Sequence, residues 1–220
     1  MGQTLKNEQY LSIDAPVDFE INIKRSRFIS SLRAVSNRIE FDEALKKINE
    51  LYPKANHYCW AYRFTENPIL EHASDAGEPP GSAGRPILGT LKKNSLLNIM
   101  AVVTRYYGGI KLGISGLICA YGEVTAQAIS KAKIIQREPM TSFDFSCSYE
   151  MYNSLLDTLK RFHISSEDIK ANFGEIIIGE FEIPLRKIEM LLKEFAEMKY
   201  SGYLTYRQKK SVNDILIPTV

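Results

Sequence analysis

Apolar residues follow two different periods along the first half of the chain, and these periods predict strands and helices in turn. Every second residue is apolar at 17–23, which indicates a half-buried strand, and a second short strand follows at 27–34. Apolar residues then recur at helical spacing over 41–51, behind Asn37 and Glu40, which form a capping-box-like pair. The chain is therefore predicted to open with two strands and a helix.

The strand predicted at 57–64 has two chemically different faces, because side chains alternate across a strand. One face carries His57, Cys59 and Arg63. A Cys–His nucleophile on this face is one alternative, but no third orienting group is evident and we favour a structural role. The other face has the outline of a base-stacking platform, although a half-buried sheet more often buries such a face in its core. Its residues are Tyr58, Trp60, Tyr62 and Phe64.

Two more helices and a strand are predicted before residue 137. A helix at 86–93 and an apolar strand at 99–107 precede a longer helix, which Ser115 caps and which runs to residue 131. We expect the buried side of this longer helix to consist of Ile118, Cys119, Val124, Ala126 and Ile129.

Beyond a boundary at 137–139 the pattern changes to the order strand, helix, strand, strand, helix, strand, which is ferredoxin-like. The sequence therefore predicts an α+β fold with two domains, at 1–138 and 139–220. The six elements of the second domain are expected at 143–149, 155–162, 164–173, 175–183, 188–195 and 203–207.

Nine of the thirteen glycines lie in two blocks, at 74–86 and 104–117, or in the helices that these blocks lead into. Such loops point free N–H groups at an anion, and basic residues lie in or beside both blocks. Neither block is a Walker loop or a dinucleotide fingerprint, and turns needed only for packing are the alternative. The candidate residues for an anion, RNA or partner site are His57, Cys59, Arg63, Asp75, Glu78, Arg85, Arg105, Gly108, Gly109, Lys111, Gly113 and Ser115.

The carboxylates Asp75 and Glu78 have two possible roles in the first block. As a catalytic pair they would need a substrate between them, whereas as loop residues they cap backbone N–H groups or pair with arginines. We favour the second interpretation and name no catalytic residue. No metal or cofactor is expected, because the available ligands lack a short repeat. Those ligands are His57, Cys59, His72 and Asp75.

Composition narrows the class of protein. The formal net charge of the 220 residues is +2, and residues 1–139 hold 18 Lys and Arg against 14 Asp and Glu, so the first part is mildly basic. No apolar run is long enough for a membrane span, and the N-terminus lacks a signal-peptide run. The three widely spaced cysteines suit reduced thiols, so we expect a cytoplasmic protein without a membrane partner.

Three segments resemble the IMPACT family, in the order that the family has them: 55–63 (ANHYCWAYR), 74–86 (SDAGEPPGSAGRP) and 103–113 (VTRYYGGIKLG). The C-terminal half looks like the small ferredoxin-like domain of the bacterial YigZ/YvyE branch. The resemblance implies a first domain with the βαβ sandwich fold of a ribosomal protein. Family members usually have glycine where this chain has Ser115, and a serine side chain narrows how closely a ligand backbone approaches.

The resemblance also implies a role in translation, which eukaryotic members regulate during amino-acid starvation. They do so largely through an additional N-terminal domain for which this sequence leaves little room, so we do not expect their kinase pathway here. We expect a regulator that binds RNA, the ribosome, a translation factor, or a phosphate or sulfate ion through the basic glycine-rich surface. The alternatives are an enzyme acting on a small phosphorylated or carboxylated substrate, and a protein–protein adaptor.

Overall fold

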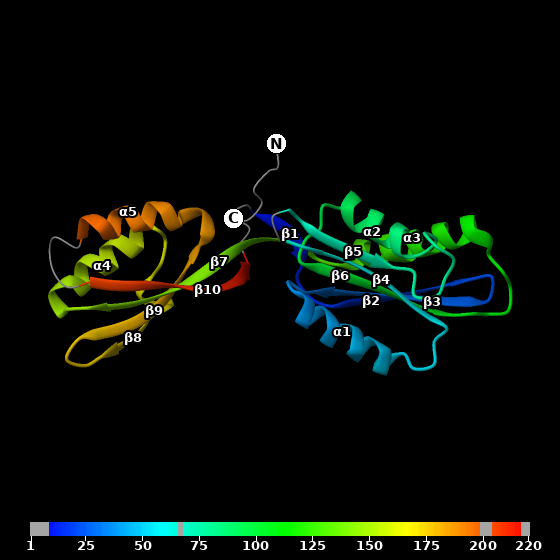
Figure 1. The fold of residues 1–220 in the computed structure, drawn as a ribbon, viewed down its shortest axis with the longest axis horizontal. Coiled ribbons are helices and arrows are strands. Elements are labelled where there is room, and N and C mark those ends of the chain that lie inside the picture. The colour runs from blue at the N-terminus through cyan, green and yellow to red at the C-terminus, as the bar shows by residue number, and fades with distance from the viewer. Residues whose placement is uncertain (1–8, 66–67, 199–203, 217–220) are drawn as a thin grey trace. The chain divides into compact units, whose positions relative to one another are not determined.

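The computed structural model describes residues 9–65, 68–198 and 204–216 (Figure 1). Two compact units divide the chain between Gln136 and Arg137. The described residues form a mixed architecture of five α-helices and two β-sheets, which confirms the predicted α+β class. The domain limits drawn from the sequence stay a prediction. None of the described helices combines the length and the apolar character needed to cross a membrane.

The first unit is built on a sheet of five strands in the order β2-β3-β6-β4-β5, with every neighbouring pair antiparallel. The order brings β6 to the centre, between strands that are far from it in sequence. The strands are β2 (Val17–Ile23), β3 (Ser26–Ala34), β4 (His57–Phe64), β5 (Leu70–Ser74) and β6 (Ile99–Tyr106). A further short strand, β1 (Tyr10–Ile13), is a neighbour of β7 (Ile134–Cys147) and does not belong to this five-stranded sheet.

Helices cover both faces of the first sheet. The helix α1 (Arg38–Leu51) begins at the predicted cap, where the Asn37 side chain accepts a hydrogen bond from the Glu40 N–H at 3.0 Å. It packs on the aromatic face of β4, and the rings of Phe41 and Trp60 lie 4.8 Å apart. The aromatic face is therefore core, as the sequence favoured.

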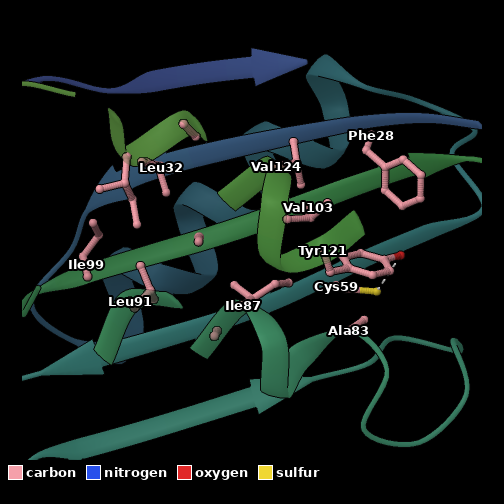
Figure 2. Packing of buried hydrophobic residues seen from close by; sticks show 14 of the residues in the cluster. Phe28, Leu32, Cys59, Ala83, Ile87, Leu91, Ile99, Val103, Tyr121 and Val124 are labelled. Carbon is pink, nitrogen blue, oxygen red and sulfur yellow. Dashed lines mark hydrogen bonds between the residues drawn. The ribbon is translucent and has the colours of Figure 1, made fainter. Parts of the chain in front are cut away.

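The opposite face of the sheet lies under α2 (Gly84–Lys93) and α3 (Gly113–Lys131), and Figure 2 shows the apolar cluster between them. Cys59 and Tyr121 lie at one end of this cluster, beside the loop that leads to Ala83. The Cys59 thiol and the Tyr121 ring therefore belong to the apolar core at this end of the sheet.

The buried side of α3 differs from the prediction. Ile118, Cys119 and Ala126 are exposed, and the buried stripe follows the i, i+3, i+4 and i+7 spacing of one helix face. The helix is apolar nearly all round, so hydrophobicity alone did not select the face. The buried residues are Leu117, Ala120, Tyr121, Val124, Thr125, Ala128 and Ile129.

The second unit has the ferredoxin-like order of elements, and its strands lie in the order β10-β7-β9-β8, with neighbours antiparallel. Two helices cover one face, where Phe143 and Phe181 stack with ring centroids 5.6 Å apart. The closing strand predicted at 203–207 is observed from Leu204 onward, and residue 203 lies outside the described residues. The elements are β7 (Ile134–Cys147), α4 (Tyr149–Arg161), β8 (Lys170–Phe173), β9 (Ile177–Pro184), α5 (Ile188–Met198) and β10 (Leu204–Leu216), with 3₁₀ turns at Ser166–Asp168 and Leu185–Lys187.

Candidate functional site

Four loops of the first unit meet at one end of its sheet. In the strand register, Arg105 lies opposite both Phe28 and His57, so the ends of β6 and the starts of β3 and β4 are level. Trp60 lies opposite Ser74, which places the end of β5 nearby. We call this the loop end, and it consists of the turn 24–25 and the loops 52–56, 75–83 and 107–112. Both glycine blocks belong to it.

The first glycine block contains its own anion. The Asp75 carboxylate accepts hydrogen bonds from the backbone N–H groups of Gly81, Ala83 and Gly84 at 2.8, 2.9 and 2.8 Å. Burial alone would raise the pKa of Asp75, but these three N–H groups and the nearby Arg85 charge bring the pKa below its ordinary value. The donors at the start of α2 are therefore already used inside the protein.

Glu78 is the centre of a buried polar cluster. Its Oε1 accepts hydrogen bonds from Arg105 Nη1 at 2.6 Å and from the Tyr121 hydroxyl at 2.8 Å. Glu78 is 8% exposed and Arg105 5%, so the two charges balance each other with little access to solvent. His57 Nε2 lies 3.9 Å from the same oxygen. The interpretation of Asp75 and Glu78 as capping and pairing residues is confirmed.

The geometry does not assemble a nucleophile from Cys59 and His57. The Cys59 thiol lies within hydrogen-bond distance of the Asp75 carbonyl oxygen, at 2.9 Å, and of the Tyr121 hydroxyl, at 3.3 Å. Burial raises the pKa of Cys59 to about 12, so the thiol stays protonated at neutral pH. His57 directs Nδ1 at the Ala76 carbonyl oxygen, 3.0 Å away, and no group of three or more potential metal ligands is found among the described residues.

Arg63 shares a strand face with His57 but lies at the other end of β4, about 20 Å along the strand at ~3.3 Å per residue. There its Nη1 donates to the Leu96 carbonyl oxygen at 2.9 Å, and its Nε pairs with Glu71 at 3.2 Å. The expectation that Arg63 joins the glycine loops is therefore wrong.

The second glycine block has no internal carboxylate at its helix. The helix α3 begins at Gly113, its cap residue Leu112 supplies no side-chain hydrogen bond, and Ser115 lies within the first turn. Ser115 is thus not the cap that the sequence predicted. Gly109 and Gly113 adopt φ of +84° and +72°, a region that favours glycine.

Gly108 is required for a close approach between two loops. A Cβ at this position would lie 2.0 Å from the Arg25 carbonyl oxygen, and the Gly108 N–H donates to Ser26 Oγ at 3.2 Å. The turn between β2 and β3 is therefore packed directly against the second glycine block.

Five exposed cations surround the loop end, and none of them forms an ion pair within the part of the chain that the structure describes. Arg85 and Lys111 were recognised from the sequence. The other three were missed because they come from segments distant in sequence and carry no local motif. Arg105, by contrast, is neutralised by Glu78. We call these five the cation rim: Lys24, Arg25, Lys54, Arg85 and Lys111.

Comparison with known proteins places this geometry in a family. The IMPACT family member YvyE from Bacillus subtilis strain 168 is 34% identical over 204 residues, which are 93% of this chain and 82% of the relative. The chain belongs to the IMPACT family. Its residues 24–129 match the Impact N-terminal domain, and all four loops of the loop end lie inside that match.

Other relatives show how far the IMPACT likeness extends. YigZ from Escherichia coli strain K12 is 31% identical over 86% of this chain and 93% of the relative. A crystal structure described as that of a hypothetical protein has a TM-score of 0.64 and 28% identity, covering 90% of this chain and 96% of the other. Protein IMPACT from Danio rerio is 36% identical over 98 residues, which are 42% of this chain and 30% of the relative.

Proposed function

We propose that this IMPACT family chain is a cytoplasmic regulator of translation that binds RNA through the phosphate groups facing its loop end. One observation carries the proposal: the loop end has five exposed cations, while its two carboxylates are turned inward. An exposed surface of positive charge attracts a polyanion and releases the counterions that are condensed on its phosphates.

The conformation of the β2–β3 turn supports the same proposal. Lys24 and Arg25 adopt φ of 43° and 64°, a two-residue turn in which Asn and Gly are the usual residues. Long basic side chains at left-handed positions are an unfavourable choice for stability. Their presence here is explained if they contact a ligand.

The spread of the cations favours a chain of phosphates over a single ion. They come from two loops, one turn and the first turn of α2, so their ammonium and guanidinium groups start from separate backbone segments. Contacts to several phosphates of a single strand give log K a slope against log salt of about −0.7 for each contact. Three to five contacts correspond to a slope of about −2 to −3.5.

The test is fluorescence anisotropy of a labelled single-stranded RNA, titrated with protein at several salt concentrations. Removing two rim cations in a Lys54→Ala, Lys111→Ala variant is expected to make the slope shallower by about 1.4. Lys46→Ala is the matched control, because Lys46 is an exposed lysine in the middle of α1. The proposal fails if the wild-type protein does not bind at low salt, or if the rim variant and the control behave alike.

A protein partner is the second candidate, because α3 exposes isoleucines beside the second glycine block. Ile114 is 59% exposed, and Ile110 and Ile118 are also exposed. Exposed apolar side chains that gather in one place mark interaction surfaces more often than singly scattered ones. Ile114→Ser, Ile118→Ser is expected to abolish a protein interaction and to leave the salt slope for RNA unchanged.

A further inference from the structure

One aromatic ring at the loop end, that of Tyr107, is exposed and also contacts a buried arginine. Tyr107 is 42% exposed, and the guanidinium carbon of Arg105 lies 5.3 Å from the centre of its ring. The same guanidinium lies 5.2 Å from the Phe28 ring, which is buried. Arg105 is thus located between two rings and is itself held by Glu78.

The backbone around Tyr107 is fixed on both sides. The Tyr107 N–H donates to Asn56 Oδ1 at 2.7 Å, and the Asn56 N–H donates to the Arg105 carbonyl oxygen at 2.9 Å. On the other side Gly108 is packed against Arg25, as described above. A ring that is already ordered loses little conformational entropy when a ligand stacks on it.

The neighbouring aromatic residues do not share these properties. The Tyr106 hydroxyl donates to the Pro53 carbonyl oxygen at 3.1 Å, and Arg27 covers its ring at 5.4 Å. The aromatic face of β4 lies under α1. Compared with Tyr106 and the aromatic face of β4, Tyr107 is therefore the residue that presents a ring to solvent next to rim cations.

The flanking charges specify the kind of ligand. Lys54 is two residues from Asn56, Arg25 lies against Gly108, and Lys111 follows in the loop of Tyr107. A π-face with cations on the neighbouring backbone segments suits a ligand that has both a flat group and an anionic group. An unpaired nucleotide has this form, because its base stacks on an aromatic ring and its phosphate meets the basic groups.

We propose that Tyr107 stacks on an unpaired nucleobase, which makes the loop end a site for single-stranded RNA rather than for a duplex. This inference rests on the proposed function, because the rim cations must hold the phosphates on either side of the stacked base. The stacking is independent of sequence, since every base has a π-face.

The test compares Tyr107 variants on two probes, a single-stranded RNA oligonucleotide and an abasic oligonucleotide of the same length. Tyr107→Ala is expected to weaken RNA binding about 5–150-fold without changing the salt slope, and to leave abasic binding unchanged. Tyr107→Phe is expected to retain wild-type affinity, because it keeps the ring. Tyr149→Ala is the matched control, an exposed tyrosine in the second unit.

The outcomes separate this inference from the proposed function. Salt-dependent RNA binding that Tyr107→Ala does not weaken overturns the stacking and leaves the phosphate surface standing. An equal loss on both probes also overturns it, because the variant then acts through the backbone of the loop. If Tyr107→Ala does not fold, Tyr107→Leu replaces it, since leucine covers Arg105 but offers no π-face. If the wild-type protein binds neither probe, both proposals fail together.

Discussion

The two glycine-rich loops of the first unit look alike in composition and lead to helices on the same face of the sheet. They differ in what they offer to the backbone N–H groups at the start of each helix. In the first loop, Asp75 occupies the N–H groups at the start of α2, and Gly84 is needed because a Cβ there would lie 2.8 Å from the backbone of Ser74. In the second loop, a Cβ added at Gly109 or Gly113 would have no neighbouring atom within 4 Å, and no side chain of the described residues caps α3.

This difference teaches that glycine density does not by itself indicate a ligand. A loop of this kind is a closed structural part when a carboxylate at the right spacing reaches its donors. It is a candidate for binding an external anion when no such carboxylate exists and the nearby charges are basic. The second loop, with Lys111 inside it and Arg25 against it, meets the latter description.

The largest effect on stability is expected at the ion pair between Glu78 of the first loop and Arg105, which precedes the second loop. Glu78→Ala leaves Arg105 buried without a carboxylate, which is expected to lower the free energy of unfolding by about 3–5 kcal/mol in urea denaturation. Glu78→Gln retains hydrogen-bond acceptance and is expected to lose less. A loss of unfolding free energy below about 1 kcal/mol for the alanine variant would mean that the Arg105 guanidinium becomes hydrated. The two loops would then be less coupled than their contacts indicate.

A smaller loss is expected from Asp75→Ala, about 2–3 kcal/mol, because three charge-assisted hydrogen bonds to backbone N–H groups disappear. The folded-state pKa of Asp75 is lowered, so its contribution is fully present above the unfolded pKa of about 3.9 and is lost as pH falls through the folded pKa. The difference between variant and wild type, measured by urea denaturation, should therefore be constant near neutral pH and shrink below about pH 4.

The same variant tests whether the two loops become equivalent. Without the Asp75 carboxylate, sulfate is expected to raise the melting temperature of Asp75→Ala more than that of the wild type, because the start of α2 is then an empty anion site. An equal rise in both proteins would show that these donors stay closed without their carboxylate.

The smallest effect concerns the second loop. Sulfate or phosphate at ten times its Kd stabilises a one-site protein by about 1.4 kcal/mol. Lys111→Ala is expected to remove about 0.5–1 kcal/mol of this stabilisation, measured as a smaller anion-dependent rise in melting temperature. Lys46→Ala controls for the general exclusion of sulfate from protein surfaces. Equal rises in the two variants would assign the second glycine block to turn geometry alone.

The sequence predicts the fold well where a segment with periodic apolar residues is long. The helix α1 and the strand β4 are found as predicted, because Asn37 and the alternation at 57–64 are unambiguous local signals. The strands β1 and β5 were missed, since they have four and five residues and carry too few alternations to count. The face of α3 was misjudged because Ile118 and Leu117 are equally apolar in sequence.

The candidate site was readable only in part. The capping by Asp75 is short-range chemistry within one loop, and the sequence predicts it. The sequence predicts an arginine partner for Glu78 without identifying it, because Arg105 lies 27 residues away. Arg63 was misplaced because a shared strand face says nothing about distance along the strand. Lys24 and Lys54 were missed because their position depends on the order of strands in the sheet, which no local pattern encodes.

The three thiols of the chain have unequal accessibility, and this provides a practical handle. Burial raises the pKa of Cys59 and of Cys147, whereas Cys119 is exposed on α3. A maleimide dye should therefore label the native protein at Cys119 without any engineered mutation. That position lies six residues, about 9 Å along the helix axis, from Gly113. The unmodified chain thus has its own attachment point for a fluorophore that would test whether a ligand binds at the second glycine loop.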